Sequence, residues 1–528
     1  MKKLAVIVVS ILFLGCYVNY AKVLARFDQR VLGTEVLSQE EIDALCEGKE
    51  EVFIEPEIFL NEGKIPYDSE QNMLLVPQRL SEEGFLGDLS INSESDQEGI
   101  LYFLEDEEGF QNKEVSISQN RVFRLWLIGD TQYWMYNVYF TGTPVAFITS
   151  SGVMNEEGDN LGSIEVFDQY HSAMEYQCAD CKWHVRGATT LNYEKKCYRL
   201  SLTDDKLSFL GMRKDDDWIL HALYDDDGLI HNKLSYEVWQ RIAWDNHVNY
   251  DEGIRMEYVE LFMDNTYLGV YGLSERIDQK VLSMTSRDIL YKCVDQFDPG
   301  VDDFYSELTE DMSPTFKMKY PKEFAMEDWE PLRQWTDLFL FDGLSDYGQG
   351  TEIINMENAI DYNLFNLLTC GMDNIVKNIY FHAVHQGNGS YQMIKIPWDL
   401  NMTWGNSWID DYYRNYNCFQ ERNFDAPNGW TLDVKALYRL NPEEMGKQLS
   451  ERWWELREDI ITKEALYDIV DAQYDYLHGS GAYTRNYLWW PPNGEYWQDI
   501  YIYEYIDKRL DFLDSYIERL RNGAWYEL

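Results

Sequence analysis

The chain has 528 residues, of which 45% are hydrophobic and 15% aromatic, including 18 Trp and 39 Tyr. This composition is too apolar for a disordered chain, and the length predicts about two to four compact modules. Asp and Glu total 93 against 45 Lys and Arg, a formal net charge of −48, which argues against nucleic acid as a partner.

Residues 1–25 are typical of an export signal, because two lysines precede an apolar run over 4–15 and Cys16. Three fates fit this segment: acylation of Cys16 after cleavage, a membrane anchor over 4–21, or cleavage after Ala25. All three predict an exported bacterial protein, and the first two predict one tethered to the membrane by a lipid or an anchor.

The next region, residues 26–140, contains no catalytic motif. Ser38 and Glu41 have the spacing of a capping box and predict the start of a helix. Alternating apolar and polar residues then predict strands, including a β hairpin with a polar tip over 150–162. The predicted strands cover residues 122–127, 133–140, 144–149 and 163–168.

Three glycines lie in that hairpin tip, Gly152, Gly158 and Gly162. They do not have the G-x-G-x-x-G spacing, and no G-x-x-x-x-G-K-S/T motif occurs in the chain. We therefore assign them to turns. A nucleotide site must be sought in other residues.

The eight cysteines are too sparse for a disulfide-rich scaffold. One local group combines cysteine with histidine, and three states fit its spacing: a structural zinc site, a small disulfide between Cys178 and Cys181, or free thiols. The group consists of His171, Cys178, Cys181 and His184, with Cys197 nearby.

Lys195 and Lys196 open a predicted alternating strand that runs to residue 202. Because successive side chains of a strand point to opposite faces, the two lysines must lie on different sides. Another short strand is predicted over residues 218–222.

Three consecutive aspartates, residues 225–227, precede a predicted amphipathic helix over 229–244 that contains Glu237. A metal cluster is one interpretation of the three acids. Acids before a helix also cap its N terminus and interact favourably with its dipole. We favour capping.

The clearest hairpin covers residues 257–277, where two alternating strands flank the turn Asp264-Asn265. Helical periodicity prevails afterwards. Strands before this point and helices after it predict an α+β fold with a β-rich lobe and an α-rich lobe. The predicted helices cover residues 329–341, 357–369, 442–476 and 496–521.

The candidate catalytic residues follow the helix over 357–369. Asp373 and Asn378 form a D-x-x-x-x-N segment, and a predicted β hairpin over 379–396 separates it from Asp399. Protein kinases place their catalytic loop and their metal-binding aspartate in this order. This order therefore predicts phosphoryl transfer.

Phosphoryl transfer depends on positioning and on neutralisation of charge, which Mg²⁺ on hard oxygen ligands and a lysine on the phosphates can supply. Lys195 or Lys196 is the candidate lysine. With Glu237 downstream, these residues stand in the order of the lysine and helix glutamate that form an ion pair in kinases.

Four motifs occur in order along the chain: Arg186-Gly187 with residues 195–200, residues 261–271 with 274–278, residues 373–378, and residues 396–399. This set resembles the spore-coat CotH kinase family from about residue 140 to 520. The resemblance implies an atypical, two-lobed protein-kinase-like fold that binds ATP with Mg²⁺. It also implies phosphorylation of Ser or Thr on extracytoplasmic or spore-coat proteins, with the spore surface as a further location.

The resemblance also implies the boundaries of the domain and the roles of its residues. Residues 141–525 would form the kinase-like domain, with 141–278 as the β-rich lobe and 279–525 as the α-rich lobe. Asp373 would be the catalytic-loop aspartate and Lys195 the phosphate contact, while Glu275 would lie near the nucleotide. The other implied residues are Lys196, Arg186 and Glu237 around ATP, and Asn378, Asp399 and Asn401 on the metal.

Two departures from the family pattern bear on activity. The family usually has W-D-x-D where this chain has Asn401, and Arg-Asn where it has His231-Asn232. Because loss of a carboxylate weakens metal binding, an alternative is a kinase-fold protein of surface or coat assembly with weak or no turnover. A third hypothesis, glycan binding or hydrolysis, rests only on abundant aromatic and acidic residues.

Overall fold

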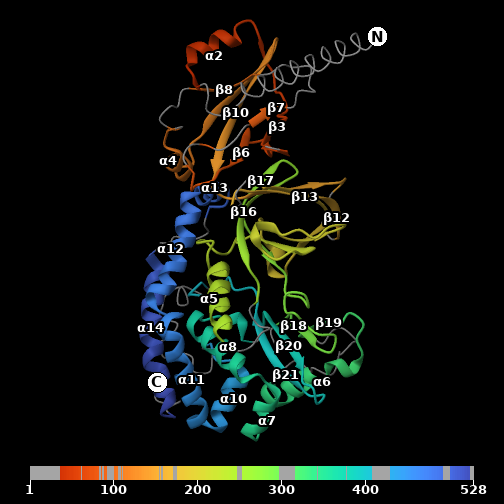
Figure 1. Ribbon diagram of the computed structural model, residues 1–528, viewed down its shortest axis with the longest axis vertical. Coiled ribbons are helices and arrows are strands. Elements are labelled where there is room, and N and C mark those ends of the chain that lie inside the picture. The colour runs from red at the N-terminus through yellow and green to blue at the C-terminus, as the bar shows by residue number, and fades with distance from the viewer. Residues whose placement is uncertain are drawn as a thin grey trace, which may run out of the picture. The chain divides into compact units, whose positions relative to one another are not determined.

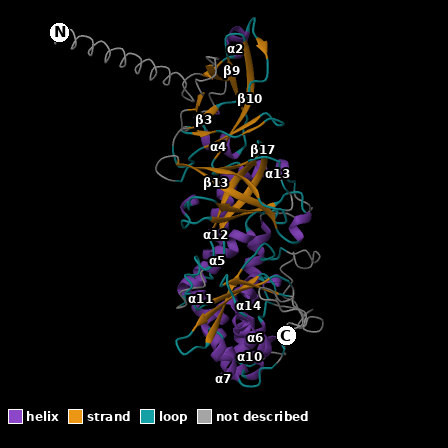
Figure 2. Ribbon diagram, turned by 90° about the vertical axis from the view of Figure 1, so that its right-hand side faces the viewer, coloured by secondary structure: helices purple, strands orange, loops and turns teal. Residues whose placement is uncertain are grey.

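The computed structural model has the predicted α+β character, with eleven α-helices among the described residues (Figure 1; Figure 2). The chain divides into two compact units. The first comprises Met1–Ala222, Tyr258–Tyr271 and Asp475–Pro491, and the second comprises Leu223–Glu257, Gly272–Tyr474 and Pro492–Leu528. The structure describes residues 36–60, 62–82, 85, 89–91, 100–104, 109, 111–153, 155, 158–170, 175–246, 253–295, 315–341, 343–375, 377–406, 429–491 and 500–523.

In the first unit, the N-terminal region forms a mixed sheet with the strand order β1-β8-β9-β10-β6-β5, and β2 pairs with β10. A smaller sheet has the order β4-β3-β7. The predicted capping box of Ser38 and Glu41 is confirmed at the start of α2. The elements are β1 Val36–Leu37, α2 Gln39–Cys46, β2 Glu50–Glu51, β3 Ile58–Leu60, β4 Gly63–Lys64, β5 Tyr67–Asp68, β6 Met73–Pro77, β7 Leu89–Ile91, β8 Ile100–Leu104, α4 Lys113–Ser118, β9 Phe123–Ile128 and β10 Gln132–Thr141.

The second part of this unit is a closed barrel with the order β11-β12-β13-β14-β15-β17-β16. The parallel pairing of β11 with β16 closes it. Phe167, Phe262 and Tyr267 of the barrel share one apolar core with Leu74 and Phe140 of the N-terminal sheet, so both parts are packed together. The barrel strands are β11 Val145–Ser150, β12 Asn160–Asp168, β13 Glu175–Arg186, β14 Cys197–Leu202, β15 Asp217–His221, β16 Met256–Met263 and β17 Thr266–Glu275.

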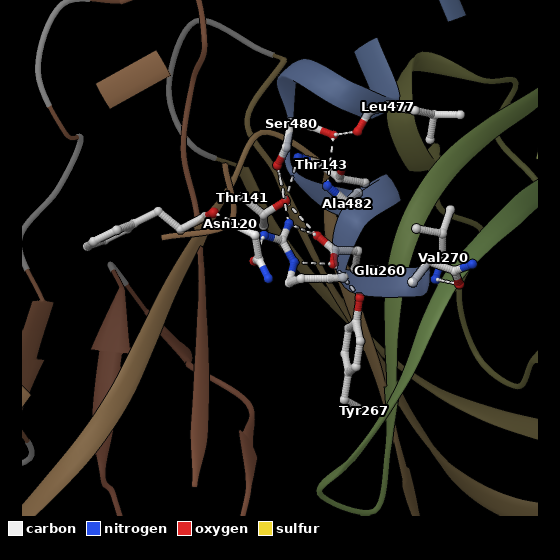
Figure 3. Close-up of polar contacts among 12 residues, drawn as sticks. Asn120, Thr141, Thr143, Glu260, Tyr267, Val270, Leu477, Ser480 and Ala482 are labelled. Atoms are coloured by element: carbon white, nitrogen blue, oxygen red, sulfur yellow. Dashed lines mark hydrogen bonds and ion pairs between the residues drawn. The ribbon is translucent and has the colours of Figure 1, made fainter. Parts of the chain in front are cut away.

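Helix α13, Ala482–Trp489, is fastened to this barrel by a fully buried ion pair. Arg485 binds Glu260 through two contacts of 2.7 Å. Glu260 also accepts hydrogen bonds from Thr141 and Tyr267 (Figure 3). A chain segment more than 200 residues away in sequence is thereby fixed against β16.

The second unit contains a four-stranded antiparallel sheet with the order β19-β18-β20-β21. Helix α8 is almost entirely buried, which confirms that its apolar stripe belongs to the core. The elements are α5 His231–Asp245, β18 Ile289–Cys293, β19 Phe316–Tyr320, α6 Glu330–Trp335, α7 Tyr347–Ile353, α8 Met356–Thr369, β20 Ile379–His385, β21 Tyr391–Pro397, α10 Leu432–Leu440, α11 Pro442–Asp459, α12 Lys463–Gly479 and α14 Ile500–Arg521.

Several predicted elements differ in extent. The helix predicted over 329–341 is divided into α6, Glu330–Trp335, and a π-helix, Thr336–Leu340. Strand β14 begins at Cys197, because the Lys196 ammonium donates to the carbonyls of Leu191 and Tyr193 and holds the preceding turn. The helix predicted over 442–476 is divided between α11 and α12, since the Thr462 hydroxyl accepts from Ala465 N at 2.9 Å and starts a new helix.

Among the described residues, no helix is both long and apolar enough to cross a membrane. The predicted export signal over residues 1–25 lies outside the described residues.

Candidate functional site

One buried asparagine, Asn374, holds the loop between α8 and β20. Its side-chain Nδ2 donates to the backbone carbonyls of Asn378, at 3.2 Å, and Trp398, at 2.8 Å. The backbone N–H of Trp398 donates to the same Asn378 carbonyl at 3.1 Å. The loop that carries Asp373 is therefore tied to the end of β21, directly before Asp399.

Asp373 and Asp399 interact electrostatically. Burial raises the pKa of Asp373, nearby Lys377 opposes this, and the negative charge of Asp399 raises it further. Neither carboxylate accepts a hydrogen bond from a described residue, and the side-chain amide of Asn378, 9% exposed, has no partner among them either. Three oxygen-bearing side chains in one loop region are thus available to a ligand.

Helix α5 supports the same loop from a distant part of the chain. The Asn232 side-chain oxygen accepts from Leu400 N at 2.8 Å, and the Tyr236 hydroxyl accepts from Asp399 N at 3.2 Å. These bonds fix Asp399 with a φ of +61°, in the left-handed region that non-glycine residues seldom adopt. The Asn232 contact also gives the His231-Asn232 pair a structural role beside the site.

The acidic turn before α5 contributes a carboxylate that the sequence did not assign to the site, Asp225. Asn401 Nδ2 donates to Asp225 Oδ2 at 2.8 Å. Asn406 Nδ2 joins the two segments by donating to the backbone carbonyls of Asp225 and Asn401, each at 2.9 Å. Burial, followed by the charge of Asp399, raises the pKa of Asp225 to about 6.

The capping interpretation of the three aspartates holds for Asp226. Its carboxylate accepts from His231 N at 2.8 Å and lies 2.6 Å from His231 Nδ1. The first turn of α5 therefore receives a fully buried acidic partner. Neighbouring aspartates of one turn thus have different roles.

The side-chain oxygens in this region are of the kind that binds a hard cation. Among the described residues, no three Asp, Glu, His or Cys side chains are grouped as a complete metal site. Mg²⁺ does not need one, because it usually binds one or two carboxylates, waters and the phosphates of a substrate. Asp399, Asn378 and Asn401, the predicted metal ligands, offer oxygens of the required kind.

The predicted ATP-contacting residues Lys195, Lys196 and Arg186 belong to the first unit. Lys195 is 2% exposed, and its ammonium donates to Val270 O at 2.6 Å and Asn486 Oδ1 at 3.0 Å. Burial lowers its pKa to about 7. Arg186 ends β13, and its predicted contact with ATP stays a prediction.

The two predicted glutamates belong to the second unit. Glu237 forms an ion pair of 3.0 Å with Lys233, one turn earlier on α5. Glu275, at the end of β17, is buried and accepts a hydrogen bond from Arg255 N at 3.0 Å. Their proposed positions near the nucleotide stay predictions.

Cys178 and Cys181 are free thiols, so of the three alternatives for this group the disulfide is wrong. They project from β13 to opposite faces, because Cys178 is exposed and Cys181 buried. Burial raises the pKa of both thiols. His171 lies outside the described residues, so the zinc interpretation of the full group stays a prediction.

Sequence reasoning missed Asp225, Lys377 and Asn374. Lys377 directly precedes Asn378 and Asn374 directly follows Asp373, so their position inside the motif was the available signal. No sequence signal linked Asp225 to Asn401, 176 residues away.

Comparison with family models gives a match to the CotH kinase protein family over residues 183–519. A search of curated proteins gave no match. The matched segment is more than half of the chain and includes Asp225, Asp373, Asn378 and Asp399. The chain therefore belongs to the CotH kinase protein family and is a kinase-like protein.

Proposed function

We propose that this protein transfers the γ-phosphoryl group of ATP to Ser or Thr of an exported or spore-coat protein, in an Mg²⁺-dependent reaction. The observation that supports the proposal most is the pair of hydrogen bonds from Asn374, which ties the Asp373 loop to the segment before Asp399. Family membership independently favours kinase chemistry.

Asp373 is proposed as the residue that orients the acceptor hydroxyl and takes up its proton. Its carboxylate is partly buried, and no described hydrogen-bond donor occupies it. Lys377 lies near enough to oppose the rise in the pKa of Asp373, which favours the ionised, proton-accepting form.

Asp399, Asn378 and Asn401 are proposed to hold Mg²⁺, which would neutralise the charge of the phosphates. Lys195 remains the proposed phosphate contact, with Lys196, Arg186, Glu237 and Glu275 as the proposed surroundings of ATP. An exported, membrane-tethered location is proposed from residues 1–25.

The test combines a transfer assay with a binding assay on the full chain. Purified protein, Mg²⁺ and γ-labelled ATP are incubated with a Ser-rich acceptor, and ATP binding is measured by calorimetry. Asp373→Asn should lower transfer by about 10²-fold or more and leave ATP binding nearly unchanged. Asp399→Asn should weaken Mg²⁺-dependent ATP binding.

Asp511→Asn, an exposed aspartate on α14, is the matched control and should change neither measurement. ATP binding without transfer to any acceptor or to the protein itself would overturn the kinase proposal in favour of an assembly protein. Absence of Mg²⁺-dependent ATP binding would overturn the nucleotide site as well.

A further inference from the structure

The contact between Asp225 and Asn401 gives this site a carboxylate that its motif lacks. Asn401 occupies the second acidic position of the W-D-x-D pattern that the chain otherwise resembles, as Trp398, Asp399 and Asn401. An amide oxygen can bind a cation but carries no charge, so the site loses one negative charge at position 401.

Asp225 is placed to restore that charge. Its Oδ2 lies 2.8 Å from Asn401 Nδ2, so the two side chains occupy adjacent positions. The negative charge of Asp399 acts on Asp225 as well as on Asp373. A cation bound beside Asp399 would offset the repulsion between these carboxylates.

The position of Asp225 is fixed by the surrounding backbone. Asn406 joins the carbonyls of Asp225 and Asn401 through one side-chain nitrogen. The adjacent Asp226 caps α5 through His231. Asn406 thus holds the backbone carbonyl of Asp225, and His231 holds the next residue, Asp226. The Asp225 carboxylate is therefore preorganised without a bound ion.

The hydrogen bond between Asn401 and Asp225 explains why an amide, and not a second acid, lies opposite Asp225. Two carboxylates 2.8 Å apart would have to share a proton, whereas an amide N–H donates to a carboxylate and stabilises its charge. The pair thus keeps one charge and one hydrogen bond, with the acid on the turn before α5 and the amide after β21.

We propose that Asp225, oriented by Asn401, is an acidic ligand of the divalent cation held beside Asp399. This inference rests on the proposed function, because it assigns one more residue to the same cation. Asn378, a residue that is 9% exposed and whose side-chain amide is unpartnered among the described residues, is a further proposed ligand of this cation.

The test measures binding of Mn²⁺, alone and with a non-hydrolysable ATP analogue, by electron paramagnetic resonance on the full chain. Asp225→Asn should weaken Mn²⁺ binding by about 10-fold or more, because the remaining amide pair carries no charge. The exchange variant Asp225→Asn with Asn401→Asp should recover affinity to within about 3-fold, since it only transposes acid and amide.

Asp227→Asn, in the same turn, is the matched control and should bind Mn²⁺ like the unaltered protein. Recovery by the exchange variant also shows that the turn still folds. If Asp225→Asn binds Mn²⁺ normally while Asp399→Asn does not, the role of Asp225 is refuted and the proposed function stands. If the unaltered protein binds no Mn²⁺ with or without the analogue, the proposed function fails instead.

Discussion

Removal of either partner of the buried ion pair between Arg485 and Glu260 should strongly destabilise the barrel. Both side chains are 0% exposed and meet through two contacts of 2.7 Å. Arg485 also donates to Asn120 Oδ1 at 2.9 Å, and Glu260 accepts from Thr141 and Tyr267 (Figure 3). Every charge in the network is therefore compensated inside the protein.

Arg485→Met would leave the Glu260 carboxylate buried without a counter-charge. Removal of one partner of a buried pair costs about 3–5 kcal/mol, because the remaining ion keeps its desolvation penalty. The hydroxyls of Thr141 and Tyr267 still donate to Glu260 and place the expected loss near the lower end, about 3 kcal/mol. Glu260→Gln should be similarly costly, since it leaves a buried guanidinium.

The double variant Arg485→Met with Glu260→Gln removes both charges. It should lose less than the sum of the single variants, with a coupling free energy of about 2 kcal/mol or more. Urea unfolding followed by far-ultraviolet circular dichroism gives the free energy of unfolding for all four proteins.

Arg199→Met is the matched control within the barrel. Arg199 pairs with Asp217 at 2.9 Å, but the two side chains are 33% and 18% exposed, so the expected loss is about 1 kcal/mol or less. The reasoning would be refuted if Arg485→Met cost no more than this control, or if the single effects were additive.

Two further predictions concern Lys195 and the turn after β16. Burial lowers the Lys195 pKa to about 7 while an unfolded lysine titrates near about 10.4; stability should rise with pH between these values, by up to ~1.4 kcal/mol per pH unit. Lys195→Met should lose this rise. The free energy of unfolding is measured by urea unfolding at several pH values, and an equal dependence on pH in the variant and the unaltered protein would contradict the prediction. Asn265, with a φ of +66°, should tolerate glycine, whereas Asn265→Ala should cost about 1–2 kcal/mol, and equal thermal midpoints for the two variants would argue against backbone strain.

Much of the local structure could be predicted because it depends on neighbours in sequence. The alternation in residues 257–277 predicted β16 and β17, and the turn Asp264-Asn265 has the positive φ angles that a two-residue hairpin needs. The capping box at Ser38 was recognised from a spacing of three residues. Boundaries such as the start of β14 depended on hydrogen bonds of lysine side chains, which periodicity does not report.

The candidate site was predictable in part. Asp373, Asn378 and Asp399 share one short segment, and pairing of β20 with β21 places Ile379 opposite Pro397, so the ends of this segment meet. The environment of Lys195 could not be read in the same way. Its partner Asn486 is 291 residues away, and a lysine next to a strand gives no sign of being fully buried.

The sequence alone determined the α+β class, the family resemblance and the order of the acidic motif, because these properties lie in composition, periodicity and short spacings. Only the tertiary structure decided that Asp225 joins Asn401 and that Asn232 and Tyr236 of α5 support Asp399, across separations of 163 to 176 residues. Such contacts depend on how buried helices and strands pack. Packing brings together side chains whose separation in sequence is arbitrary, so no spacing could have predicted them.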